Sequence, residues 1–156
     1  MNHQILQAST ECNVQIMSKL LKRLDQTSIL VIGDLLVDDY IYGRTERVSR
    51  EAPVPIMVKS KSRSAAGGAA NAAAVAAGLG GEIHAAGFVG DDEQGRKLLG
   101  ILLEQGVKLS HAPIRGLHTA TKTRYLAGSL GTSYQQVLRV DQPLRCDNDK
   151  WDVVEE

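Results

Sequence analysis

The sequence predicts an α/β fold in which helices flank a parallel sheet and a smaller β-rich part lies beside it. Two short apolar runs, residues 28–33 and 84–89, are typical of buried parallel strands. Helical patterns over residues 69–79 and 91–105 precede and follow the second run. The order strand, helix, strand, helix indicates one parallel layer joined by right-handed crossovers.

Residues 1–27 are expected to form an amphipathic helix and a lead-in to the first strand. Apolar side chains recur at helical spacing, with lysines and an arginine between them, at Val14, Met17, Leu20, Leu21 and Leu24. Such a stripe predicts that the helix packs on the rest of the domain. The first strand then ends at Gly33, and Asp34 follows it directly.

Two β-rich segments interrupt the α/β pattern, at about residues 39–59 and 119–140. The first contains short strand-like pieces, and its two prolines restrict it to an edge strand or a small flap. The second alternates on both sides of a glycine-containing turn, as hairpins do. We expect the second segment to join the first within a domain that spans residues 28–145. A polar tail over residues 146–156 follows it.

Charge and composition exclude several classes of partner. Among the 156 residues, 18 basic side chains balance 18 acidic ones, so no overall field attracts nucleic acid. No apolar run approaches the roughly 20 residues that cross a bilayer, and the N-terminus lacks the pattern of a signal peptide. We therefore expect a cytoplasmic protein that binds neither nucleic acid nor membrane. Cys12 and Cys146 are expected to be free thiols that hold no metal.

A glycine pair before the first internal helix is the clearest candidate binding site. Gly67 and Gly68 allow a ligand to approach backbone N–H groups, and Asn71 offers an amide one turn later. A helix-start turn that serves only packing would explain the glycine pair equally well. Asp34 and Asp38 follow the first predicted strand, and open α/β sheets bind ligands at the carboxyl ends of their strands. Because a carboxylate can bind neighbouring hydroxyls, these residues together indicate a site for a polyol.

The spacing of these residues resembles a family signature. Residues 66–73 read Ala-Gly-x-Ala-x-Asn-x-Ala, and Gly80 and Gly90 follow after six and nine residues. This pattern is similar to the first signature of the ribokinase-like (PfkB) carbohydrate kinases, and the resemblance covers about residues 28–141. The segment Gly90-x-Asp92-x-x-Gly95 is similar to the one that follows in these kinases, although a helix cap alone would explain Asp92.

The resemblance implies a ribokinase-like, Rossmann-like sheet with a β-lid that excludes water from the reaction. The family's reaction transfers the γ-phosphoryl group of ATP, with Mg²⁺, to a sugar hydroxyl. By this resemblance Asp38, Gly67, Gly68 and Asn71 hold the sugar hydroxyls. The lid is also a candidate surface for forming a homodimer.

Within the family, residues 33–40, 47–55 and 135–141 resemble the bacterial heptose-7-phosphate kinases of ADP-heptose and lipopolysaccharide-core synthesis. Arg50 departs from that branch, where a proline precedes Glu51. The resemblance implies a sugar-phosphate ligand whose anomeric hydroxyl is phosphorylated.

A phosphorylated ligand requires cations, and the second β-rich segment offers three. Lys122 and Arg124 lie on the same face of their predicted strand, because alternate residues of a strand share a face. Arg139, on the partner strand, could join them. For each of these residues, a solvated charge on a hairpin is the simpler explanation, and Arg47 has the same standing.

The later Gly-Ala-Gly-Asp motif of the family does not occur in these 156 residues, and neither does a Walker-type phosphate loop. That motif supplies the base and the backbone N–H groups for phosphoryl transfer. We therefore expect the N-terminal portion of a sugar kinase, without its C-terminal half. Such a portion has no catalytic residue or metal ligand of its own and little or no kinase activity alone. ATP and Mg²⁺ would serve only the full-length enzyme.

Three alternatives remain open on the sequence. The chain could belong to a ribokinase- or fructokinase-type enzyme of the same family. It could be a non-catalytic module that binds sugar phosphate or dimerises through its lid. A truncated gene product with an unpaired sheet edge would instead associate non-specifically.

Overall fold

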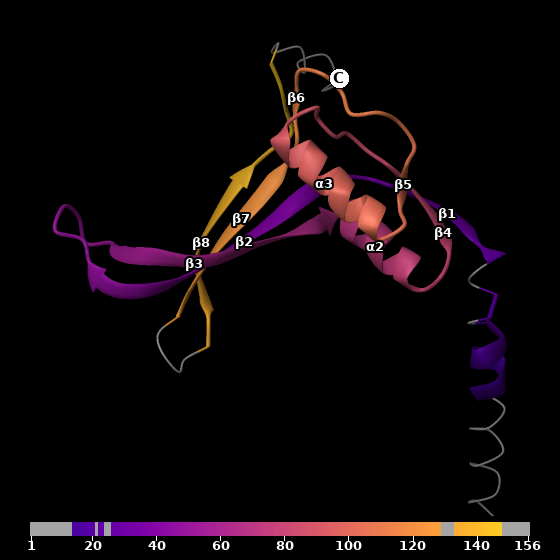
Figure 1. The fold of residues 1–156 in the computed structure, drawn as a ribbon, viewed down its shortest axis with the longest axis horizontal. Coiled ribbons are helices and arrows are strands. Elements are labelled where there is room, and N and C mark those ends of the chain that lie inside the picture. The colour runs from indigo at the N-terminus through magenta and orange to yellow at the C-terminus, as the bar shows by residue number, and fades with distance from the viewer. Residues whose placement is uncertain (1–13, 21, 24–25, 129–132, 148–156) are drawn as a thin grey trace, which may run out of the picture.

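The computed structural model describes residues 14–20, 22–23, 26–128 and 133–147 and has two parts, an α/β body and a long sheet that projects from it (Figure 1). The body contains a three-stranded parallel sheet in the order β1-β4-β5. Its strands are β1 (Ser28–Ile32), β4 (Glu82–Ala86) and β5 (Lys108–Leu109). The predicted parallel layer is therefore confirmed, but the expectation that its first strand is buried is wrong, because β1 is largely exposed.

Two helices connect the strands of the body. Helix α2 (Ala69–Gly78) precedes β4, and helix α3 (Glu93–Glu104) lies between β4 and β5. Alanine favours helix and allows close packing, which explains why the alanine-rich segment of α2 is helical despite its lack of a side-chain cap. Asp92 caps α3 by accepting a hydrogen bond from the Gly95 N–H.

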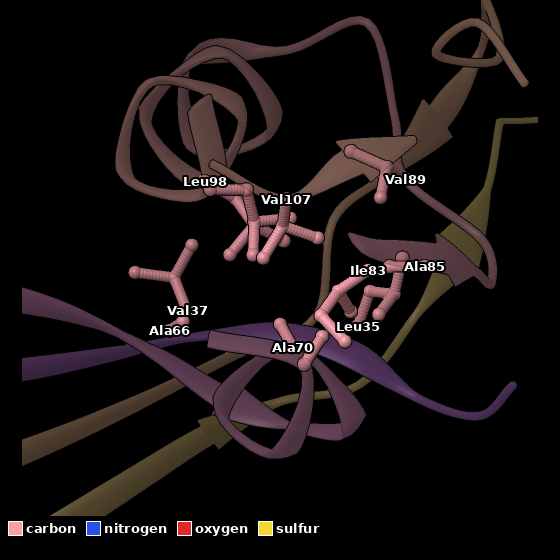
Figure 2. Packing of buried hydrophobic residues seen from close by; sticks show 11 residues of the cluster. Leu35, Val37, Ala66, Ala70, Ile83, Ala85, Val89, Leu98 and Val107 are labelled. Carbon is pink, nitrogen blue, oxygen red and sulfur yellow. The ribbon is translucent and has the colours of Figure 1, made fainter. Parts of the chain in front are cut away.

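The core lies where α2 and α3 meet β4 and the base of the projecting sheet (Figure 2). Ile83 and Ala85 of β4 are fully buried, as is Leu98 of α3. Leu35 and Val37 come from the first strand of the projecting sheet, so the same residues close the core and anchor that sheet.

The projecting sheet has four strands in the order β3-β2-β7-β8. Strands β2 (Leu35–Val48) and β3 (Pro55–Gly68) are antiparallel, as are β7 (Thr121–Gly128) and β8 (Gln135–Gln142). Strands β2 and β7 pair in parallel, which joins the two β-rich segments. The predicted hairpin and the joining of the two segments are confirmed. The predicted edge position holds for β3, which contains Pro55, but it is wrong for β2, which lies between β3 and β7.

The sequence patterns place several boundaries incorrectly. They predict the first β-rich segment over about residues 39–59, but its strands run from Leu35 to Gly68. They predict the second parallel strand over residues 84–89, but it covers Glu82–Ala86. The apolar run misleads because Val89 is fully buried in the core after the chain has left the sheet.

Residues 14–20 are helical, as predicted, but they do not pack as predicted. All seven are exposed, and the helix lies away from the body (Figure 1). The expectation that its apolar stripe packs on the domain is wrong for these residues; Leu21 and Leu24 lie outside the described ones. Two short strands, β6 (Leu117–His118) and β9 (Arg145–Cys146), form an antiparallel pair that no sequence pattern predicts.

Candidate functional site

Four of the predicted polar residues line two hollows of the structure, and these are Asp34, Asp38, Asn71 and Lys122. The first, the Asp38–Asn71 hollow, is an open pocket of about 410 Å³ lined by Asp38, Tyr40, Tyr42, Arg63, Ala65, Ala66 and Asn71. The second, the Asp34–Lys122 hollow, has about 280 Å³. Asp34, Lys122 and Asp141 line it together with apolar side chains, among them Phe88 and Leu144. The predicted site is thus divided between two neighbouring hollows.

Asp38 is held in place from the neighbouring strand. The Arg124 guanidinium donates a hydrogen bond of 2.5 Å from Nη1 to Asp38 Oδ1, and it lies 5.3 Å from the centre of the Tyr40 ring. The side chains of Asp38 and Arg124 are only 16% and 21% exposed, so water screens this pair weakly. Arg124 is therefore a partner of Asp38, and only the second carboxylate oxygen has no partner among the described residues.

Gly67 makes room for the Asp38 carboxylate. A Cβ at Gly67 would collide with Leu36 Cδ1 and would lie 2.8 Å from Asp38 Oδ2. The next residue, Gly68, has a φ of +59°, which side chains rarely tolerate, and a Cβ there would meet the Asp34 carbonyl oxygen. Both glycines are therefore required by close packing at the end of β3.

The sequence predicts that the glycine pair exposes backbone N–H groups to a ligand. In the structure, Gly67 and Gly68 are the last residues of β3 and lie opposite Leu36 and Leu35 of β2. The next N–H, that of Ala69, donates to the Asp34 carbonyl oxygen at 2.9 Å. The structure thus shows Gly67 and Gly68 as members of the β2–β3 ladder. That their N–H groups are open to a ligand remains a prediction.

Asn71 lies in the first turn of α2 and is exposed on the rim of the Asp38–Asn71 hollow. Helix α2 begins where β3 ends, so the tight turn at Gly68 sets Asn71 beside the face of the sheet that carries Asp38. An amide and a carboxylate across one hollow can together bind several hydroxyl groups. This is the arrangement that the spacing of Asp38, Gly67 and Asn71 predicts.

The three predicted cations are all close to carboxylates. Arg139 donates two hydrogen bonds to Asp141, of 2.7 Å from Nε and 2.5 Å from Nη2. These bonds lower the pKa of Asp141, and the charges of Lys122 and Arg124 lower it further. Lys122 lies in register between Asp38 on β2 and Asp141 on β8. Charge on this half of the sheet is therefore largely balanced.

Tyr40, Tyr42 and Arg63 also line the Asp38–Asn71 hollow, and the sequence patterns do not single them out. Arg63 escapes notice because the patterns end the β-rich segment near residue 59. The alternation Lys-Ser-Lys-Ser-Arg-Ser over residues 59–64 is a period-2 strand signal that could have extended it. The face of β3 that carries Gly67 then includes Arg63, four residues earlier.

Comparison with protein families decides what kind of protein carries these hollows. The sequence profile of the pfkB family carbohydrate kinases matches residues 26–137. The chain belongs to this family. The matched range contains every residue that lines the Asp38–Asn71 hollow. It contains the lining of the Asp34–Lys122 hollow except for residues 141–144.

Curated relatives of this PfkB chain are bifunctional proteins. The chain is 42% identical over 119 residues to the bifunctional protein HldE of Methylobacillus flagellatus, a match that covers 76% of the chain and 23% of the relative. It is 41% identical over 119 residues to the bifunctional protein HldE of Magnetococcus marinus, covering 75% of the chain and 23% of the relative. The chain thus spans about a quarter of the length of these relatives.

Solved structures share the fold of the PfkB chain. A carbohydrate kinase from Agrobacterium tumefaciens superposes with a TM-score of 0.57 at 23% identity, over 74% of this chain and 35% of that one. An Arabidopsis thaliana ribokinase, solved with ribose and ATP, gives a TM-score of 0.55 at 21% identity over 74% and 35%. The predicted ribokinase-like fold is confirmed.

A polar cluster anchors strand β7 of this PfkB chain to the body. Asp92 accepts hydrogen bonds from the Gly95 N–H (2.7 Å), the Thr119 N–H (2.9 Å) and the Thr119 hydroxyl (2.8 Å). Burial raises the pKa of Asp92, but these hydrogen bonds outweigh burial, and its pKa lies below the ordinary value. Asp92 is thus a helix cap, as its position suggested, and also holds the start of the strand that carries Arg124.

The described part of the PfkB chain carries neither a metal cluster nor a membrane-spanning helix. No three His, Cys, Asp or Glu side chains in residues 14–20, 22–23, 26–128 and 133–147 come together as metal ligands would. None of the helices there is both long and apolar enough to span a bilayer. Cys146 is a half-buried free thiol, and Cys12 lies outside the described residues.

Proposed function

We propose that this chain forms the acceptor side of an ATP-dependent sugar kinase whose acceptor is D-glycero-D-manno-heptose 7-phosphate. The full reaction would phosphorylate the anomeric hydroxyl, a step in making ADP-heptose for the lipopolysaccharide core. The observation that carries the proposal is the Asp38–Asn71 hollow, whose lining combines an amide with a carboxylate that packs against Gly67. Membership of the PfkB family supports a sugar as the ligand.

The choice of heptose is supported by the curated relatives. Identity of about 40% to HldE proteins over 119 residues exceeds the 21% identity to the ribokinase described above. The segments around residues 33–40 and 47–55, which resemble heptose-7-phosphate kinases, lie on β2 and on the turn that leads to β3. A ribokinase- or fructokinase-type ligand is the alternative outcome of the binding experiment below.

In this proposal each residue of the hollow binds and orients the sugar. The Asp38 carboxylate accepts hydrogen bonds from sugar hydroxyls through Oδ2, while Arg124 fixes its direction through Oδ1. Asn71 donates to or accepts from a further hydroxyl. The four-stranded sheet covers the sugar on one side and limits the access of water.

ATP and Mg²⁺ are implied by the family, and the described residues do not fit them. Neither a three-ligand metal cluster nor a glycine-rich phosphate loop is present in this part of the chain. The chemistry of phosphoryl transfer is therefore assigned to no residue here. We expect the purified chain to bind the acceptor without transferring phosphate to it.

Two further features belong to this proposal. The edge strand β8 is exposed along its whole length, which offers an unpaired edge to a second copy of the lid. Sedimentation at rising protein concentration should therefore reveal a dimer, and a chain that stays monomeric contradicts this part.

The cytoplasm, where ATP is available, is the proposed location.

Titration calorimetry tests the proposed ligand. The chain should bind heptose 7-phosphate in the absence of nucleotide and should bind ribose and fructose much more weakly. Asn71→Ala should weaken heptose-7-phosphate binding about tenfold, the equivalent of one lost hydrogen bond. Leu103→Ala, on the exposed side of α3, is the matched control and should leave it unchanged.

Two results would overturn the proposal. Preference for ribose or fructose would favour the other kinases of the family. Phosphorylation of heptose 7-phosphate by this chain with ATP and Mg²⁺ would refute its role as the acceptor side alone.

A further inference from the structure

The face of the projecting sheet that carries Asp38 has two electrostatically different halves. On β7 and β8 the cations have carboxylate partners: Arg124 pairs with Asp38, and Arg139 pairs with Asp141. Lys122 lies in register between these two aspartates. An anion that approached Lys122 would therefore also meet two negative charges.

The half formed by β3 is different, because its cations have no acidic partner among the described residues. Arg63 lies opposite Tyr40 in the register of β2 and β3, and it makes no hydrogen bond or ion pair with any described side chain. Lys61, two residues earlier, places its ammonium 4.8 Å from the centre of the Tyr42 ring. A cation over an aromatic ring keeps its charge, so this half of the face is net positive.

Arg63 also lies at the right place for a ligand. It lines the Asp38–Asn71 hollow and is exposed, so its guanidinium is accessible from that hollow. Along β3, Arg63 shares a face with Ala65 and Gly67, because alternate residues of a strand point to the same side. A molecule bound to Asp38 across Gly67 would therefore extend along β3 toward Arg63.

We propose that Arg63 binds the phosphate group that the sugar ligand already carries and so selects sugar phosphates over free sugars. A guanidinium matches a phosphate with two parallel hydrogen bonds, which makes arginine the residue suited to such selection. The inference rests on the proposed function and deepens it. It also replaces Lys122, Arg124 and Arg139 as the phosphate-binding group, because those side chains are committed to Asp38 and Asp141 or lie between them.

The test compares heptose 7-phosphate with the unphosphorylated heptose by calorimetry on the full chain. Arg63→Met removes the charge and keeps most of the length, so heptose-7-phosphate binding should weaken by about 10- to 100-fold. Binding of the unphosphorylated heptose should not change. Arg63→Lys should restore part of the lost affinity, because it returns a charge without the bidentate geometry. Arg115→Met, which removes an exposed cation that lines neither hollow, is the matched control and should retain binding of both ligands. Lys122→Met tests the alternative assignment of the phosphate to β7.

The outcomes separate this inference from the proposed function. An equal loss for both ligands in Arg63→Met would show a structural effect and overturn the inference. Loss in Lys122→Met without loss in Arg63→Met would also overturn it and would reassign the phosphate to β7. A wild-type chain that binds heptose with or without phosphate equally well would overturn the inference and leave the sugar site standing. A wild-type chain that binds neither ligand would overturn the proposed function, and the inference with it.

Discussion

At the scale of single residues, the site depends on the missing side chain of Gly67. The Asp38 carboxylate occupies the space that a Cβ at this position would take. The same carboxylate is fixed by Arg124 on its other side. Gly67, which the sequence suggests as a place for a ligand to approach the backbone, is therefore first of all required for packing against Asp38, the residue proposed to bind the ligand.

Gly67→Ala should displace Asp38 and Leu36, because the added Cβ collides with both side chains. We expect a loss of about 1–3 kcal/mol in the free energy of unfolding, as for other overpacked sites, together with loss of sugar binding. Gly100→Ala is the matched control, because a Cβ at this position of α3 would have no heavy atom within 4 Å. It should stabilise the chain by about 0.5–1 kcal/mol. Urea unfolding measures both, and a neutral Gly67→Ala would contradict the packing argument.

Asp92→Ala should remove both the cap of α3 and the clamp on Thr119. Three hydrogen bonds to one carboxylate are lost, so we expect the free energy of unfolding to fall by about 1–3 kcal/mol. Asp91→Ala, next to it, breaks only an exposed pair with Arg96 at 3.3 Å and should change stability by less than about 0.5 kcal/mol. Equal effects of the two changes, measured by thermal unfolding, would contradict the role assigned to Asp92.

The pKa of Asp92 adds a pH signature to this site. The pKa of Asp92 in the folded chain lies below the ordinary value of 3.8. The stability that its charge contributes is therefore fully present above pH 3.8. The contribution is lost as the pH falls through the lowered pKa. Between about pH 5 and about pH 2 the wild type should therefore lose more stability than Asp92→Ala does. Parallel pH profiles of the two proteins would show that Asp92 contributes nothing through its charge.

At the scale of elements, the parallel pairing of β2 and β7 makes one lid from two separate insertions. Patterns in the sequence could predict the two segments and their joining through alternation and turn residues. The alternation over residues 59–64 could have extended β3, but the patterns could not predict β2 beyond Tyr42, since residues 43–47 have no apolar face. The helix and strand signals of the body were readable because one face of each element is buried in the core.

The pair Asp38–Arg124 should couple strands β2 and β7 energetically. In a double-mutant cycle with Asp38→Asn and Arg124→Met, we expect a coupling of about 1–3 kcal/mol in unfolding free energy, because both side chains are largely buried. The pair Glu82–Lys108 also joins two neighbouring strands, but its side chains are 53% and 62% exposed, so its cycle should give a smaller coupling. Equal coupling energies in the two cycles would contradict the argument that the more buried ion pair is the stronger one.

At the scale of the whole molecule, one face of the parallel sheet has no helix over it among the described residues. Val31 packs on the core, so its neighbours Leu30 and Ile32 lie on the opposite face, where they are 55% and 74% exposed. The apolar composition of strand β1 predicts burial on both faces, whereas the structure leaves this face exposed among the described residues. The residues of the Asp38–Asn71 hollow differ in how far the signature points to them. Asp38 and Asn71 are part of the resemblance that includes Gly67, whereas Arg63 depends on the length of β3.

The uncovered face should bind an apolar fluorescent dye of the anilinonaphthalene type. The double change Leu30→Lys and Ile32→Lys should lower the dye fluorescence and raise solubility, because it removes apolar area from a continuous patch. Leu103→Lys is the control, since Leu103 is 78% exposed on α3. Dye binding that falls as much in the control would contradict the existence of a patch on the sheet.

The central claim is that the Asp38–Asn71 hollow holds the sugar, and nuclear magnetic resonance can test it residue by residue. Heptose 7-phosphate would be added to the ¹⁵N-labelled chain without nucleotide, and the backbone N–H shifts followed. We expect the largest shifts at Asp38, at Arg63 and in the turn from Gly67 to Asn71. Shifts centred instead on Asp92 and His118, or no shifts at saturating ligand, would contradict the claim.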